Sequence, residues 1–341
     1  MKDGFNRIFK SGVSTWLVSL LLLITVMVVI GGITRLTGSG LSMVEWKLVM
    51  GSLPPFTDLQ WLETFAKYQS FPEYQKINQG MSLSQFKFIF FWEYLHRMLG
   101  RVIGLVCILP YFYFLIKGRL SAVLKKRGLI IIFLVIVQGL LGWYMVKSGL
   151  VNNPHVSHFR LASHLSLAFF FFVYVLWCLL DELKVSRFSV SQNLRRGVGG
   201  FVFFLSLQIV YGAFTAGLKA GHMMNTFPLM AGKLIPDLVY GLTPFWRNMI
   251  ENPFAIQFIH RWLGIVVFTL GGILSYKFFK QKLSYFQRQT IIVFISVLSF
   301  QVLLGISTLV LQVPLILGVL HQLTALFLLG ISTFLLYQVY R

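Results

Sequence analysis

Residues 14–34 read STWLVSLLLLITVMVVIGGIT, an apolar run without a charged side chain. A helix of about 20 residues crosses the hydrocarbon core of a bilayer, so this run predicts a membrane-spanning helix. Seven further apolar runs follow, near residues 88–116, 128–147, 161–180, 198–217, 254–276, 290–312 and 315–339. Helices are expected for all eight runs, because a backbone in lipid has to satisfy its own hydrogen bonds.

The composition agrees with eight membrane spans. Hydrophobic residues make up 57% of the 341-residue chain and charged residues 12%, and the mean hydropathy of +0.76 excludes a soluble globular domain. The net charge of +20 does not indicate a nucleic-acid partner, because basic residues spread through an apolar chain serve membrane orientation. Cys107 and Cys178 lie in apolar runs and lack the spacing of a metal or redox pair. The predicted fold class is an all-α membrane protein surrounded by lipid.

Basic residues indicate the orientation of the chain. Of the 30 Lys and Arg residues, 17 lie at the two termini and in the links 117–127, 181–196 and 277–288. Short segments rich in Lys and Arg stay on the cytoplasmic side, so both termini are expected in the cytoplasm. The longer segments 35–87 and 218–253 are then external. Their prolines and tryptophans, including Trp46, predict short helices at the membrane surface.

An internal repeat relates the two halves of the chain. EYLHRMLG at 93–100 matches QFIHRWLG at 257–264 with an offset of 164 positions, and VQGLLG at 137–142 matches FQVLLG at 300–305 with an offset of 163. Duplicated membrane proteins build their sites at corresponding positions of the repeats. We therefore expect two repeated four-helix bundles, with domains at 1–190 and 191–341.

Four histidines occupy corresponding positions, on the second and fourth helix of each half: His96, His164, His260 and His321. Imidazole is a common axial ligand of heme iron, and helical bundles hold it from facing helices. A single histidine in a span also serves as an interhelical hydrogen-bond partner, but four at related positions and similar depth favour two bis-histidine heme sites. Zinc or copper is disfavoured because no Cys, Asp or Met cluster joins them. The other histidines, His155, His158 and His222, are interpreted as loop residues.

One carboxylate interrupts the repeat. Glu93 lies three positions before His96, on nearly the same helix face, and its counterpart is Gln257. A carboxylate at this depth is costly without a task or a partner. Two interpretations stay open, an ion pair with Arg97 or Arg101 and a catalytic acid in a reactive first half. Three arginines lie near the histidines in the sequence, namely Arg97, Arg101 and Arg261. Their side chains either reach outward to water or bind heme propionates.

Several long strings resemble the heme A synthase family. They are GGITRLTGSGLSMVEW at 31–46, PEY at 72–74, NQGM at 78–81, WEYLHR at 92–97, AGLKAGHMMNTFPLM at 216–230 and QFIHR at 257–261. The similarity covers nearly the whole chain and is closest to the form shared by mitochondria and proteobacteria. The cysteine pair in the external loops of the other bacterial form is absent.

The resemblance implies oxidation of the C8 methyl group of heme O to a formyl group by successive hydroxylations, which yields heme A for terminal oxidase assembly. It implies heme b as cofactor on His260 and His321, the substrate heme on His96 and His164, and Glu93 as the catalytic glutamate that stabilises positive charge at the methyl group or manages protons. It also implies the bacterial inner (plasma) membrane, with heme O synthase and an electron donor as candidate partners. The sequence is also compatible with a homo-oligomer of this chain.

Two other functions are compatible with a duplicated membrane bundle. A cytochrome b-type electron-transfer protein would also use paired histidines, but it gives no reason for Glu93 to lack a counterpart. A duplicated transporter would be expected to have spans broken by Gly or Pro near the midplane, whereas the present spans are continuous. An enzyme is therefore favoured.

Overall fold

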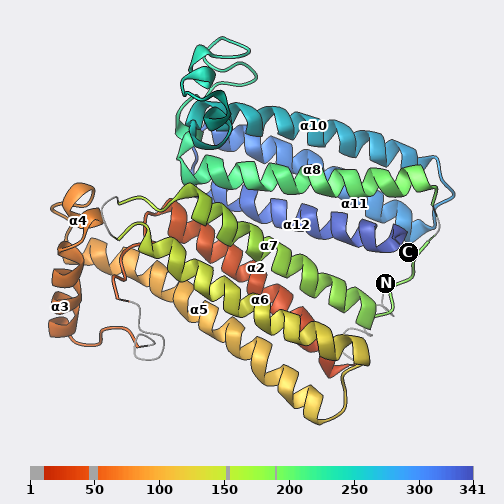
Figure 1. Cartoon of the computed structure of the whole chain (residues 1–341), viewed down its shortest axis with the longest axis horizontal. Helices are drawn as coiled ribbons and strands as arrows, with labels where there is room; N and C mark the ends of the chain where they lie inside the picture. The colour runs from red at the N-terminus through yellow and green to blue at the C-terminus, as the bar shows by residue number, and fades with distance from the viewer. Residues whose placement is uncertain (1–10, 46–52, 151–153, 189, 341) are drawn as a thin grey trace. The chain divides into compact units, whose positions relative to one another are not determined.

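The structure is a computed structural model that describes residues 11–45, 53–150, 154–188 and 190–340 (Figure 1). Within these residues it contains eight helices long and apolar enough to cross a membrane, and no β-strand. The predicted all-α membrane fold with eight spans is therefore confirmed. The basic residues counted above at the two termini, Lys2, Arg7, Lys10 and Arg341, lie outside the described residues, as does Trp46.

The eight long helices lie where the apolar runs predict them. They are α2 (Gly12–Leu36), α5 (Leu83–Ile116), α6 (Ala122–Lys147), α7 (His158–Glu182), α8 (Gln192–Gly217), α10 (Pro253–Phe279), α11 (Tyr285–Val310) and α12 (Leu315–Val339). The helices α5, α6, α8 and α11 begin five or six residues before their predicted starts, because Ser82, Ser121, Ser191 and Ser284 cap them. The apolar runs therefore underestimate helix length where a polar first turn is capped.

The described chain divides into two compact units, residues 11–171 and 172–340, and the division falls within α7. In the second unit, α8, α10, α11 and α12 form a closed ring in which each helix packs against two others. The helices α10 and α12 therefore lie at opposite corners of this ring. In the first unit, α5 packs against α2 and α6. The predicted domain boundary after residue 190 stays a prediction.

Both long polar segments contain short helices, as predicted. The first holds α3 (Asp58–Gln69) and α4 (Pro72–Lys76). The second holds the α-helix α9 (Asn248–Glu251) and the 3-10 helices η2 (Ala220–His222), η3 (Asp237–Tyr240) and η4 (Phe245–Arg247). Figure 1 shows α3 and α4 at the N-terminal end of α5. Tyr68 of α3 packs in a buried cluster with three residues of α5, namely Phe86, Ile89 and Phe90. Met43 and Val44 pack against the same cluster. Burial of this aromatic cluster holds the segment after α2 beside α5.

Polar contacts complete the attachment of α3. The Tyr68 hydroxyl donates to Glu73 at 3.0 Å and accepts from the Asn78 amide at 2.7 Å. Burial, followed by the Glu73 carboxylate, raises the pKa of Tyr68, so its hydroxyl stays a donor at neutral pH. Lys67 pairs with Glu45 at 2.9 Å. The segment 39–45 is thus held from the α3 side as well as from α5.

Candidate functional site

The four repeat-related histidines lie on α5, α7, α10 and α12, in the order His96, His164, His260 and His321. The first two belong to the first unit and the last two to the second. The Nδ1 atoms of His96, His164 and His260 are buried and have no hydrogen-bond partner among the described residues. Neutral imidazole nitrogens of this kind are common metal ligands.

Each of these imidazoles lies against a glycine of the preceding long helix. A Cβ atom added at any of the four glycines would lie 2.9–3.1 Å from Cε1 of the facing histidine. The pairs are Gly31 with His96, Gly142 with His164, Gly212 with His260 and Gly305 with His321. The missing side chain lets each ring approach a bare helix backbone. This role was not predicted, although Gly142 and Gly305 end the repeated strings VQGLLG and FQVLLG and so carried the signal.

Two repeat-related glutamines contact the histidines of α7 and α12. The Gln138 Nε2 atom lies 3.4 Å from His164 Nε2 and donates to the His164 carbonyl at 3.1 Å. The Gln301 Nε2 atom lies 3.2 Å from His321 Nδ1. Both glutamines belong to the strings that revealed the repeat.

The second histidine pair has the spacing of a bis-histidine iron site. The ring centroids of His260 and His321 are 6.4 Å apart, with an interplanar angle of 86°. Two imidazoles that bind one metal ion from opposite sides, each nitrogen at about 2 Å, have ring centroids roughly 6 Å apart. The Nε atom of Arg261 is also buried without a partner among the described residues. The histidine spacing and a free guanidinium donor beside it fit a heme with its carboxylates.

The arginine after the first histidine makes the same contacts in both halves. Its Nη1 and Nη2 atoms donate to two main-chain carbonyls of the segment that follows the first long helix of that half. The acceptors are Glu45 and Met43 for Arg97, at 2.9 and 2.7 Å, and Thr226 and Met224 for Arg261. Each acceptor of Arg261 lies 181 positions after its counterpart for Arg97. The repeat therefore extends into these two polar segments.

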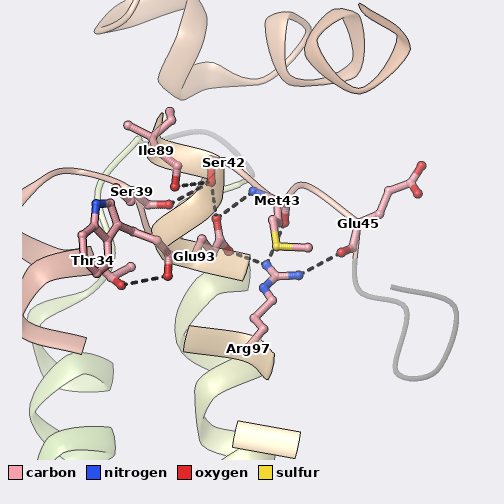
Figure 2. A network of polar contacts seen from close by, with 9 residues as sticks. Thr34, Ser39, Ser42, Met43, Glu45, Ile89, Glu93 and Arg97 are labelled. Atoms are coloured by element: carbon pink, nitrogen blue, oxygen red, sulfur yellow. Dashed lines mark hydrogen bonds and ion pairs between the residues drawn. The ribbon is translucent and has the colours of Figure 1, made fainter. Parts of the chain in front are cut away.

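Figure 2 shows the carboxylate that interrupts the repeat. Glu93 is 3% exposed, and its Oε2 atom accepts from the Ser42 hydroxyl and the Met43 N–H, both at 2.7 Å. Its Oε1 atom pairs with Arg97 Nη2 at 2.5 Å. The ion pair with Arg97, one of the two open interpretations, is therefore present. All three contacts are donors, so together they suit a carboxylate acceptor.

The counterpart of Glu93 in the second half is differently connected. The Gln257 side chain donates to the Met224 carbonyl at 3.1 Å, and its Oε1 atom is buried without a partner among the described residues. The Met224 carbonyl is also an acceptor of Arg261. The two halves thus share the contacts between the arginine and the main-chain carbonyls. They differ in the side chain beside these contacts, which is Glu93 in the first half and Gln257 in the second.

A pocket of 200 Å³ opens beside the Glu93 network. It is lined by Met43, Val44, Arg97, Trp143, Val146, Lys147 and Leu150. Arg97 and Met43 line this pocket and also contact Glu93. Two cationic side chains, Arg97 and Lys147, lie among the apolar and aromatic ones and suit a carboxylate group.

The family of cytochrome oxidase assembly proteins matches residues 14–333. The heme A synthase of Flavobacterium psychrophilum is 44% identical over 333 residues, which cover 96% of this chain and 98% of that protein. The heme A synthase of Nitrosospira multiformis is 44% identical over 93% of this chain and 90% of that protein. The heme A synthase of Wolbachia pipientis wMel is 39% identical over 95% of this chain and 91% of that protein. The chain belongs to the heme A synthase family. The resemblance stated from its motifs is confirmed.

The structure also gives the surroundings of the other residues considered from the sequence. His158 begins α7, where its ring lies 4.0 Å from that of Phe159, and His222 ends η2. Arg101 donates to the Met98 sulfur at 3.8 Å. Cys107 and Cys178 are buried and form no disulfide. Among the described residues, no three or more His, Cys, Asp or Glu side chains come together in a way that could hold a metal ion.

Proposed function

We propose that this chain oxidises the C8 methyl group of heme O to a formyl group by successive hydroxylations and so produces heme A for a terminal oxidase. The observation that carries the proposal is the buried Glu93 beside one of two repeat-related histidine pairs, with Gln257 at the corresponding position. A protein that only transfers electrons between two hemes does not require this difference. The shared name of the relatives supports the same activity.

The cofactor assigned to the second half is heme b, which His260 and His321 would hold. The 6.4 Å separation of their rings supports this assignment. Bound there, heme b would supply one-electron redox chemistry. Gly212 and Gly305 leave room for the imidazoles against α8 and α11, and the Gln301 amide nitrogen lies 3.2 Å from His321 Nδ1. We extend the assignment to the predicted domains, with the cofactor in 191–341 and the substrate in 1–190.

The substrate heme is assigned to His96 and His164 in the first half. Glu93 lies one turn before His96 on α5, on the same helix face, so a macrocycle held by His96 would extend past its carboxylate. Glu93 either stabilises positive charge that develops at the methyl carbon or accepts a proton there. Arg97 holds one carboxylate oxygen at 2.5 Å, which limits the rotation of the side chain.

The three arginines remain our candidates for heme propionates. Arg97 lines the 200 Å³ pocket together with Lys147, and Arg261 has a buried Nε atom without a partner among the described residues. Arg101 lies one turn further along α5. Because heme O is the substrate, a heme O synthase would deliver it. An electron donor and further copies of this chain are the other proposed partners.

We place the chain in the bacterial inner membrane with both termini in the cytoplasm, because the basic links lie on one side. Cysteine labelling tests this orientation, since Cys107 and Cys178 are buried and give little background. Ser70 after α3 and Lys282 between α10 and α11 are exposed. An impermeant maleimide is expected to label Ser70→Cys in intact spheroplasts and Lys282→Cys only after lysis. The reverse pattern would contradict the orientation.

Pigment extraction tests the activity. The chain is expressed in bacterial cells that make heme O and have no heme A synthase of their own, and the extracted hemes are separated by chromatography. Heme A is expected in cells with the chain and absent from cells with an empty vector. Unchanged heme O without heme A, in membranes that contain the chain and its bound heme, would support the electron-transfer alternative instead.

A further inference from the structure

We propose that Ser42 is a positioning residue for the Glu93 carboxylate, a role that rests on the function proposed for Glu93. Ser42 is 1% exposed and lies in the segment between α2 and α3 (Figure 2). Its hydroxyl lies 2.7 Å from Glu93 Oε2, 3.0 Å from the Ser39 carbonyl and 3.3 Å from the Ile89 carbonyl. A hydroxyl has one proton to donate, and the nearest and only ionisable of these acceptors is the carboxylate.

The internal repeat separates this role from a purely structural one. The carbonyls that accept from the two arginines place Met43 opposite Met224, so Ser42 corresponds to Met223. Arg261 keeps both carbonyl contacts in the second half without a hydroxyl at that position. The polar segment therefore folds against the helix without a serine. The hydroxyl occurs in the half that has Glu93 and is absent from the half that has Gln257.

Ser42 and its neighbours fix both oxygens of the carboxylate. Oε2 accepts from the Ser42 hydroxyl and the Met43 N–H, and Oε1 accepts from Arg97. With the hydroxyl removed, Oε2 keeps one donor and the side chain gains freedom to turn away from the reacting carbon. Catalytic groups lose effectiveness steeply with small displacements. The free energy of a hydrogen bond to a charged group corresponds to a change of roughly 10- to 100-fold in a rate or equilibrium constant.

The test compares Ser42→Ala with Ser39→Ala in membranes that carry the full chain. Ser39 is a matched control, since it is a buried serine of the same segment whose hydroxyl pairs with Thr37 at 2.6 Å. Ser42→Ala is expected to lower kcat for heme A formation about 10-fold or more and to leave KM for heme O and the bound heme b spectrum unchanged. Ser39→Ala is expected to keep kcat close to that of the wild type, because the Ser39 hydroxyl does not contact Glu93 and its partner Thr37 keeps a hydrogen bond to the Ile33 carbonyl.

Measuring kcat of Glu93→Gln in the same assay separates the role proposed for Ser42 from the role proposed for Glu93. Loss of activity in Glu93→Gln with a wild-type kcat in Ser42→Ala would overturn the role of Ser42 alone. Wild-type activity in Glu93→Gln would overturn the role of Glu93 and, with it, that of Ser42. A fall in heme b content in Ser42→Ala that parallels the fall in kcat would show that Ser42 only supports the fold.

Discussion

Replacing Glu93 with Gln is expected to lower heme A formation about 100-fold or more, because loss of one preorganised electrostatic group costs on the order of 10²–10³ in kcat. The amide retains an oxygen that accepts from Ser42 and Met43, so the side chain keeps its size and two of its three contacts. What it loses is the charge and the ion pair with Arg97. The measurement is the heme A to heme O ratio in extracted pigment, with heme b content followed optically in the same membranes.

The heme b content decides between the two interpretations that the sequence left open for Glu93. If the carboxylate served only to pair with Arg97, Glu93→Gln would lower the amount of folded protein and its heme b together. Glu251→Gln is the matched control, because Glu251 forms an ion pair of the same spacing with Arg247 at 2.6 Å in the other half. It should leave the heme A yield near that of the wild type. Heme A formation that stays normal in Glu93→Gln would refute the catalytic role.

The eight spans and the four histidines were predictable because both depend on local or repeated patterns. A long apolar run specifies a spanning helix without reference to the rest of the chain. The match of EYLHRMLG to QFIHRWLG placed His96 and His260 at corresponding positions before any contact was known. The helix starts were less accurate, since Ser82 and Ser284 extend α5 and α11 through capping boxes with Gln85 and Gln287.

The surroundings of Glu93 could not be predicted, because they depend on where a polar segment without periodicity returns to the helix. The sequence offered Arg97 and Arg101 equally as ion-pair partners, and the fold selects Arg97. It gave no indication that both arginines would donate to main-chain carbonyls, since every residue has a carbonyl. The correspondence of Ser42 to Met223 follows only from the arginine contacts, which align Met43 with Met224. Contacts thus extended the repeat into a region where sequence identity is low.

Replacing His260 with Ala is expected to remove most of the heme b signal from purified protein, because one of the two histidines proposed to hold the iron is removed. His96→Ala is the matched control, since it removes the corresponding histidine of the other half and should leave that signal in place. The measurement is the reduced-minus-oxidised optical spectrum per mole of protein. A full heme b signal in His260→Ala, or its loss in His96→Ala alone, would contradict the assignment of cofactor and substrate to the two halves.

The glycine contacts allow the same site to be tested without removing a ligand. A Cβ atom at Gly305 would lie 2.9 Å from His321 Cε1, whereas one at Gly272 on α10 would meet no atom within 4 Å. Overpacking of this kind costs about 1–3 kcal/mol, and Gly305→Ala can relieve it only by moving the imidazole or the helix. Reduced heme b content or a shifted spectrum is therefore expected in Gly305→Ala, with no change in Gly272→Ala. Equal spectra would mean that His321 can be displaced without effect on the heme, which would contradict its proposed role in holding the iron.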